Sequence, residues 1–402
     1  MITFRLGRPS INLFNYHKKV IFFLWLFLLV FPKGGIKLGG VPITIGYILL
    51  GITTLFALFR TNWKIQYARL MPLLCLIPFQ IISIISFLAN GYTEIGMTIS
   101  FFISFVFIPI SLLLILSNDI ETLDLSSFYN LFKIGIRIIA IYGIFLFFYK
   151  QYTGKFLEIP FLTTNLSDLG MLENKCNARQ SCSKLISTYN NGNIYGVNLL
   201  MLLPLYCILE KNFWFRSIVK LSILMTFCRT AWIGLLFSEL CFDLLISKNT
   251  KVLLAKLVGS VILFSLSIIA LSIFFPFPLS FLFDIKMAGR MEQYQNIKEL
   301  TIFAPNPIGP VSETVYFSIL NYFGVTGLLS FILAMIGPLL LNCYYFTPLR
   351  TAICLGIVNY LIIAAADGAI LLIPTMTFYW FLISLFFKKN LEPENNPIRT
   401  AQ

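Results

Sequence analysis

The sequence predicts an all-α, polytopic integral membrane protein that forms a single transmembrane domain over residues 1–402. Hydrophobic residues make up 58% of the chain and charged residues only 12%, a balance that a soluble domain of this length cannot shield from water. Apolar runs of about 20 residues recur along the chain and match the roughly 30 Å hydrocarbon core of a bilayer. These runs lack the alternating polarity of barrel strands, so we expect helices rather than a barrel.

About twelve helices are expected to span the membrane, because each apolar run is bounded by polar or charged residues. In chain order, the runs lie near 18–31, 42–59, 70–88, 95–116, 131–149, 195–209, 215–228, 230–247, 253–275, 314–341, 350–366 and 371–388. The polar tail over 390–402 is expected to lie in the cytoplasm.

Basic residues orient this predicted bundle. Clusters of Lys and Arg flank alternate runs, and the positive-inside rule places them in the cytoplasm together with both termini. An acidic segment over 117–130 fits this rule less well. The cytoplasmic clusters also explain the net charge of +13 without nucleic acid. They comprise Arg5, Arg8, Lys18, Lys19, Arg60, Lys64, Arg69, Lys211, Arg216, Lys220, Lys248, Lys251, Lys256, Lys388 and Lys389.

Arg229 lies between two apolar runs, where a charge at the bilayer centre costs about 2.5–3.5 kcal/mol. One long helix would place the flanking Lys220 and Lys248 on opposite sides of the membrane. A hairpin of two short helices places both in the cytoplasm, so the charge pattern favours the hairpin. Arg229 is then expected near its tip, in a recess just below the outer surface.

Two long polar segments, 150–194 and 276–312, are then expected to lie outside. Loops of this length are usually functional or disordered. The second keeps aromatic and apolar residues throughout, so we expect it to be ordered and to include an amphipathic helix near 289–303. In the first, Cys176 and Cys182 lie close together and either pair in an oxidising compartment or remain free thiols.

Cations gather on this expected outer face: Arg229 in the hairpin, Arg290 and Lys286 in the second segment, and Arg179 in the first. Arginine side chains bind phosphate oxygens in a bidentate manner. An anion such as a lipid-linked phosphate or pyrophosphate is therefore one expected partner. Ion pairs with neighbouring carboxylates and contacts with lipid headgroups are the alternatives.

Carboxylate and amide side chains begin helices on the same expected side. Glu313 follows a Pro-rich turn, and it is either a partner of the helix dipole or a general base. Asp367 precedes the last helix and offers the same two interpretations. Asn193 is expected to cap a helix, although its amide also suits sugar hydroxyls. The single histidine, His17, lies near the N-terminus, so neither a histidine base nor a His-rich metal site is expected.

Three segments together show a family resemblance. They are residues 226–234 (TFCRTAWIG), 288–294 (AGRMEQY) and 312–329 (SETVYFSILNYFGVTGLL). In this order they resemble the Ser/Thr-Arg-Thr motif, the outer-loop Gly-Arg segment and the following helix start of the O-antigen polymerase and ligase superfamily. Ligases of that superfamily resemble one another in carrying a His-Asn pair where this chain has Glu313-Thr314. The polymerase branch is therefore the closer match.

The resemblance implies a GT-C-like glycosyltransferase bundle in the bacterial plasma (inner) membrane, with its active site facing the periplasm. It implies a polymerase, without metal or cofactor, that joins undecaprenyl-pyrophosphate-linked oligosaccharide repeat units. Arg229 and Arg290 would stabilise the departing pyrophosphate. Glu313 would accept the proton of the acceptor's hydroxyl group or orient that hydroxyl. Further substrate contacts are expected from Lys286, Arg179, Asn193, Tyr316 and Asp367. Membrane lipids and a chain-length regulator are the other implied partners.

Two other functions stay open. A ligase would transfer the glycan to lipid A core, but the missing histidine argues against it. A transporter or flippase for lipid-linked sugars would show internal repeats and helices broken in mid-membrane. No repeat is visible in the sequence.

Overall fold

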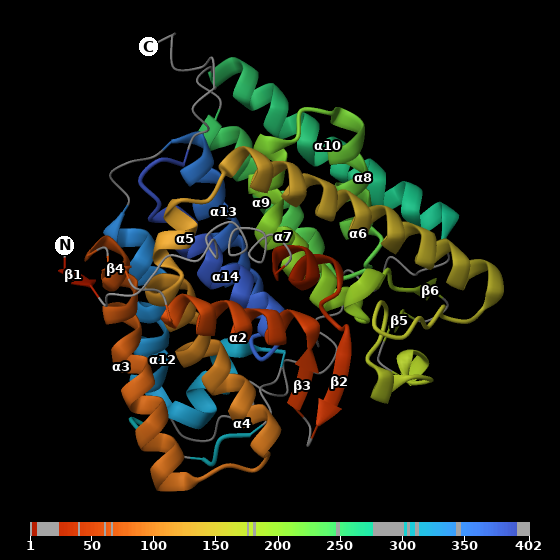
Figure 1. Cartoon of the computed structure of the whole chain (residues 1–402). Coiled ribbons are helices and arrows are strands. Elements are labelled where there is room, and N and C mark those ends of the chain that lie inside the picture. Colours follow the sequence, from red (N-terminus) through yellow and green to blue (C-terminus); the bar gives the residue numbers. More distant parts are fainter. Residues whose placement is uncertain are drawn as a thin grey trace.

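Helices dominate the computed structural model of this protein, as Figure 1 shows. The structure describes residues 2–5, 24–38, 41–59, 62–65, 67–174, 177–179, 182–246, 250–275, 301–303, 306–309, 313–342 and 347–391. Within them, each of the twelve predicted apolar runs contains a helix, and the all-α class is confirmed.

The helices in chain order are a first helix over 24–30, α2 (Ile45–Leu58), α3 (Tyr67–Asn90), α4 (Ile95–Phe102), α5 (Ser117–Glu121), α6 (Leu125–Thr153), α7 (Gly192–Leu209), α8 (Phe213–Leu224), α9 (Arg229–Ile246), α10 (Thr250–Phe274), α12 (Val315–Leu341), α13 (Pro348–Ile363) and α14 (Ile373–Phe386). The π-helical turns η1 (Ile103–Phe107) and η2 (Ile110–Ile115) continue α4, so that one helical segment runs over Ile95–Ile115.

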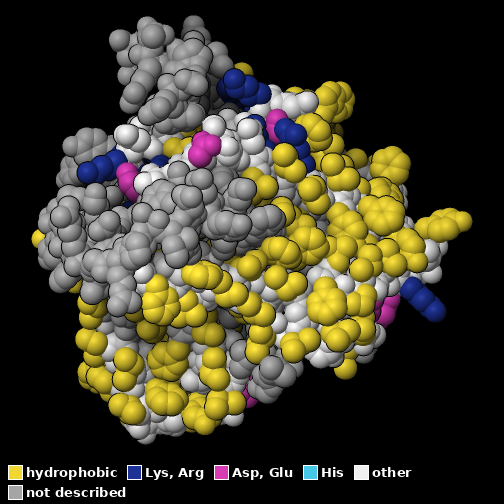
Figure 2. All heavy atoms as spheres, in the orientation of Figure 1, with side chains coloured by type: hydrophobic (Ala, Val, Ile, Leu, Met, Phe, Trp, Pro, Cys, Tyr) yellow, Lys and Arg dark blue, Asp and Glu magenta, His cyan; other side chains and the backbone are white. Residues whose placement is uncertain are grey.

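Six helical segments among the described residues are long and apolar enough to cross a membrane. They are α3, Ile95–Ile115, α6, α7, Leu254–Phe274 within α10, and α12. In Figure 2, hydrophobic side chains cover most of the described surface on the face that is drawn, as expected for a protein that faces lipid rather than water. The length and the apolar composition of these helices therefore identify the chain as a membrane protein.

The last helix, α14, lies at the centre of the bundle (Figure 1). Every described side chain from Pro374 to Lys388 is buried. Tyr379 donates from its hydroxyl to the Met335 carbonyl (2.6 Å), and the Trp380 indole N–H donates to the Ser104 carbonyl (3.0 Å). Two tightly packed helix pairs flank this core, namely α3 with α12 and α7 with α13.

Both flanking pairs are antiparallel. Ser86 near the end of α3 donates to the Tyr322 carbonyl in the first part of α12 (3.1 Å). Asn359 near the end of α13 donates to the Leu200 carbonyl in α7 (3.2 Å). Gly356 allows the close approach of α13 to α7, since a Cβ there would lie 2.1 Å from the Met201 carbonyl oxygen. The start of α7, the start of α12 and the end of α13 therefore lie at one end of the bundle.

Charged residues gather at the opposite end. Arg69 is 1% exposed, donates to the Ser117 carbonyl (2.7 Å) and pairs with Glu121 (2.9 Å). Lys388 donates to the Ile120 carbonyl (3.0 Å), and Arg350 donates to the Lys388 carbonyl (2.8 Å). The starts of α3 and α13 and the end of α14 thus meet here, as the predicted grouping of the basic clusters requires.

The helix α12 is broken at Gly324. Its φ of 69° and ψ of −170° lie in a region that only glycine adopts readily. The N–H groups released by the break are paired with residues 301–303: Val325 donates to the Thr301 carbonyl (3.0 Å) and Thr326 to the Ile302 carbonyl (3.2 Å). Residues 301–303, which belong to the second predicted outer segment, therefore pack against the break in this helix.

The part of the chain that the structure describes contains three antiparallel strand pairs. They are β1 (Ile2–Arg5) with β4 (Asn62–Ile65), β2 (Gly35–Leu38) with β3 (Val41–Thr44), and β5 (Ala178–Arg179) with β6 (Cys182–Ser183). Each pair is too short to form a stable sheet by itself, so its stability depends on the surrounding helices.

The first predicted outer loop differs from the expectation of a polar external segment. Residues 182–190 are buried among the helices. Ser187 donates to the Ile139 carbonyl (2.6 Å), and the Tyr189 hydroxyl donates to the Leu29 carbonyl (3.2 Å). Cys182 is a buried free thiol, and Cys176 lies outside the described residues. Of the amphipathic helix expected near 289–303, the structure describes 301–303, which are not helical.

Candidate functional site

A polar cavity of about 210 Å³ lies at the end of the bundle opposite the buried Arg69. It brings together Glu313, Asp367 and Asn193, three residues that the sequence singles out from separate segments. Asn191 and apolar side chains complete the lining, which comprises Ile194, Ala369, Ile370, Leu371 and Leu372. A small site with two carboxylates, two amides and an apolar wall suits a ligand that carries hydroxyl groups.

Three helices begin at this cavity, namely α7, α12 and α14. Glu313 precedes α12, and the turn from Asp367 to Leu372 precedes α14. The first N–H groups of a helix have no partner within it and carry a partial positive charge. The three helix starts therefore raise the electrostatic potential around the two carboxylates and offset part of their negative charge.

Two backbone hydrogen bonds hold the carboxylate-bearing turns together. Gly368 donates from its N–H to the Glu313 carbonyl (3.1 Å), and Val315 donates to the Ala364 carbonyl (3.1 Å). Gly368 permits this contact, because a Cβ there would lie 2.2 Å from a Val315 methyl carbon. Asp367 is 3% exposed, whereas Glu313 is exposed. Glu313 is therefore the more exposed of the two carboxylates in the cavity lining.

The N-cap of α7 is Asn191 rather than Asn193, which corrects the sequence-based expectation. Asn191 has an extended backbone, and its side-chain oxygen accepts from the N–H groups of Asn193 (2.8 Å) and Ile194 (3.3 Å). Two asparagines stand close together before the helix, and the local sequence does not distinguish them. Because Asn191 caps the helix, the Asn193 side chain is available to the cavity.

Lys184 is a site residue that the sequence does not reveal. It is 3% exposed and donates from Nζ to Oδ1 of Asn193 (3.0 Å). Its backbone N–H donates to the Asn177 carbonyl (2.7 Å), and Gly192 leaves room for its side chain. This bond fixes the Asn193 oxygen against Lys184, so the amide N–H₂ group is the part free to donate to a ligand. The apolar residues Leu185 and Ile186, which follow Lys184 directly, were the feature of the sequence that could have indicated its burial.

Replacing Lys184 by Met is expected to lower the free energy of unfolding by about 1–3 kcal/mol, because the buried Asn193 oxygen loses its donor. Thermal unfolding of the purified protein measures this change. The matched control is Lys155→Met, at an exposed lysine in the same segment, where the expected change stays within about 0.5 kcal/mol. Equal stability of the two variants would contradict the assigned role of Lys184.

Arg229 begins α9 and is half-buried, and α8 ends at Leu224. The predicted hairpin of two short helices is therefore confirmed. The turn is fixed by the Trp232 indole N–H, which donates to the Leu224 carbonyl (2.8 Å). The start of α9 packs on the start of α7, since a Cβ at Gly196 would lie 3.0 Å from the Ala231 side chain. Arg229 thus lies at the cavity end of the bundle.

The other predicted site residues have different surroundings. Tyr316 donates from its hydroxyl to the Leu361 carbonyl (2.7 Å), a contact between α12 and α13, and the cavity lining does not include it. The backbone of Arg179 pairs with Cys182 in β5–β6, and its side chain lies outside the description. Lys286 and Arg290 also lie outside the described residues. The convergence of Arg290 with Glu313 stays a prediction.

Within the described part of the chain, no three His, Cys, Asp or Glu side chains are grouped as metal ligands would be. Comparisons with models of protein families, with curated proteins and with solved structures found no match to this chain. The family resemblance therefore rests on the sequence motifs within residues 226–329 alone.

Proposed function

We propose that this protein is a membrane glycosyltransferase of the polymerase type, which joins undecaprenyl-pyrophosphate-linked oligosaccharide repeat units into a surface polysaccharide. The observation that carries this proposal is the cavity that unites Glu313, Asp367 and Asn193 beside three helix starts. In the proposed arrangement, about twelve helices form a GT-C-like bundle in the bacterial plasma membrane. Both termini are cytoplasmic, the cavity faces the periplasm, and a chain-length regulator binds the bundle.

The cavity has the groups that such a transfer requires. A hydroxyl oxygen of the acceptor sugar attacks the anomeric carbon of the donor glycan. The bond from that carbon to the pyrophosphate oxygen breaks, and its electron pair leaves with the pyrophosphate. The proton of the acceptor hydroxyl passes to Glu313, which is exposed at the cavity. General-base catalysis of this kind contributes roughly 10²–10⁴-fold to the rate.

The developing negative charge of the pyrophosphate is the largest charge that the site must stabilise. Three helix N-termini and the buried Lys184 raise the local potential, and Arg229 begins α9 at the same end of the bundle. Arg290 is proposed as a second guanidinium at this position. Asn193 and Asp367 orient the acceptor sugar, because amide and carboxylate groups hydrogen-bond to hydroxyls.

A transporter for lipid-linked sugars is the alternative that one observation favours. The break in α12 at Gly324 resembles the interrupted helices of transporters. In transporters, however, the freed backbone groups bind substrate or ions, whereas here those of Val325 and Thr326 are paired with residues 301–302. The polar cavity also lies at a bundle end. These features favour the polymerase.

The proposal is tested by replacing Glu313, Arg229 and Arg290 singly by Ala in the native host and measuring the length of the surface glycan. Loss of long chains, with single repeat units still exported and attached, is the expected result. The control is Asp124→Asn, which changes an exposed carboxylate before α6 at the opposite end and keeps a good capping residue. Normal chain length in all three variants would refute the site, and loss of all attached glycan would favour the ligase or flippase.

A further inference from the structure

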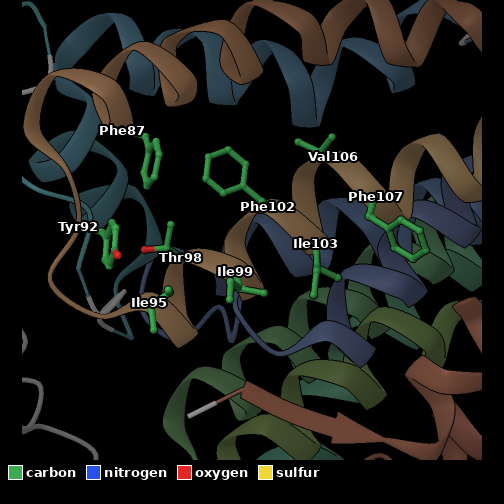
Figure 3. A pocket seen from close by; sticks show the side chains of 9 residues that line it. All are labelled: Phe87, Tyr92, Ile95, Thr98, Ile99, Phe102, Ile103, Val106 and Phe107. Carbon is green, nitrogen blue, oxygen red and sulfur yellow. The ribbon is translucent and has the colours of Figure 1, made fainter. Parts of the chain in front are cut away.

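Two parts of the described surface differ in what they offer to lipid. The first is an apolar groove of about 480 Å³ along α4, which is lined mainly by hydrocarbon side chains (Figure 3). The Thr98 hydroxyl in its wall donates to the Glu94 carbonyl (3.1 Å), so this hydroxyl is satisfied within the helix. Such a wall attracts any apolar chain alike. The second is the turn between α7 and α8, which combines exposed aromatic rings with charged groups.

The turn between α7 and α8 is held to α6 by one buried carboxylate. Glu210 is 4% exposed and accepts from Nε of Arg137 (2.8 Å) and from the Asn212 N–H (2.9 Å). Arg137 also stacks on the Phe215 ring, with its Cζ 4.1 Å from the ring centroid. These contacts join the start of α8 to α6, along which it packs (Figure 1). The charge of Arg137 is therefore compensated within the protein by Glu210.

Two lysines lie beside this turn. Lys133 precedes Arg137 by one turn of α6, about 6 Å along the helix axis. Burial raises the pKa of the Glu210 carboxyl, but hydrogen bonds and the charges of Arg137 and Lys133 bring this pKa below its usual value. Lys133 is therefore close to Glu210, and the exposed Lys211 follows Glu210 directly. The ion pairs among the described side chains include neither lysine.

The surplus positive charge at this turn comes from the lysines rather than from the helix ends. The helix α7 ends at Leu209 and α8 begins at Phe213, so the negative end of one helix lies beside the positive end of the other. The partial charges of these two ends therefore largely cancel. Because Arg137 and Glu210 compensate each other as well, Lys133 and Lys211 are left to attract an anion.

Aromatic side chains indicate the depth of this turn in the membrane. Phe213 and Trp214 are 64% and 73% exposed, and their ring centroids lie 6.1 Å apart. Exposed tryptophans of membrane proteins are enriched at the level of the lipid headgroups. The positive-inside rule predicts that this end of the bundle is cytoplasmic, and the cytoplasmic leaflet carries the anionic lipids. Lipid phosphates are therefore expected at the depth of Lys133 and Lys211.

We propose that the turn between α7 and α8 binds the headgroup of an anionic phospholipid through Lys133 and Lys211, with the acyl chains beside Phe213 and Trp214. This inference is independent of the proposed glycosyltransferase function. The helix α8 has 12 residues and extends only about 18 Å, less than the roughly 30 Å hydrocarbon core. A bound lipid that fixes the start of α8 at the headgroups therefore keeps the hairpin tip, with Arg229, below the opposite surface.

The test measures which lipid approaches Trp214. Its fluorescence is the difference between each protein and the same protein with Trp214→Phe, in bilayers that contain a tail-brominated lipid as quencher. Brominated phosphatidylglycerol in phosphatidylcholine is expected to quench Trp214 at a mole fraction about 5–30-fold lower than brominated phosphatidylcholine in phosphatidylglycerol, since each lysine contributes about fivefold. Equal quenching by the two lipids would make the turn an ordinary lipid contact and overturn the proposal.

Matched variants test the two assigned lysines. Lys133→Gln combined with Lys211→Gln is expected to abolish the preference for phosphatidylglycerol. The control, Lys155→Gln combined with Lys389→Gln, removes the same charge at two exposed lysines elsewhere and should retain the preference. In the wild type, raising the salt concentration from about 0.05 M to about 0.5 M should also remove it, because salt screens exposed charges. A preference that persists in the first variant or at high salt, or that the control loses equally, would refute the assignment.

Discussion

In the proposed polymerase mechanism, replacing Glu313 by Gln is expected to lower the turnover of the purified protein by about 10²–10⁴-fold, because the amide cannot accept the proton of the acceptor hydroxyl. Substrate binding should change far less, since the amide keeps the size and most of the hydrogen-bonding capacity of the carboxylate. The measurement is the rate of polymer formation from lipid-linked repeat units at saturating substrate. KM is determined in parallel to separate binding from chemistry.

Asp124→Asn supplies the control for this experiment and should retain the activity of the wild type. Asp367→Asn adds a discriminating comparison, because Asp367 is 3% exposed and lines the same cavity. If Asp367→Asn abolishes turnover and Glu313→Gln does not, the roles of the two carboxylates must be exchanged. Full activity of both variants would show that neither carboxylate acts as the base.

Replacing Gly324 by Ala is expected to lower the free energy of unfolding by about 3 kcal/mol. One contribution is the backbone conformation, which disfavours any residue with a Cβ. The other is crowding: the new Cβ would lie 2.7 Å from the Ile302 carbonyl oxygen and 2.9 Å from that of Thr301. Both are backbone atoms that cannot move aside as a flexible side chain does.

Chemical or thermal denaturation in detergent, followed by tryptophan fluorescence, measures this loss. Gly51→Ala and Gly259→Ala are matched controls within α2 and α10, where a Cβ would have no neighbour within 4 Å. These two changes should be neutral or should stabilise by up to about 1 kcal/mol through helix propensity. A Gly324→Ala protein as stable as the controls would show that α12 tolerates a continuous helix.

The sequence predicts the helices and the hairpin well because both depend on local patterns. Apolar runs specify helices in a membrane since the backbone must pair internally. Lys220 and Lys248 flank the Arg229 turn, and the positive-inside rule places both on the same side of the membrane. This placement predicts two short helices, and the structure has them as α8 and α9. The meeting of Arg69 with Lys388 at one bundle end follows from the same rule.

The sequence does not predict the features that depend on distant partners. The burial of Lys184 was missed because the polar composition of 150–194 indicates an exposed loop, whereas its polar groups find partners on Ile139, Leu29 and Asn193. The break at Gly324 was missed because an isolated glycine within an apolar run is compatible with a helix. Its effect depends on residues 301–303, which are distant along the chain.

The central position of α14 has a consequence for biogenesis. The chain emerges from the ribosome with its N-terminal part first, and the helices that surround α14 are inserted before it exists. Until residues 373–386 have been translated, the walls contributed by Trp25, Ser104 and Met335 lack the side chains that they contact in the finished protein. The bundle therefore closes only after α14 has been inserted, and a nonsense codon shortly before α14 would leave a protein without its central helix, which membrane proteases are expected to remove.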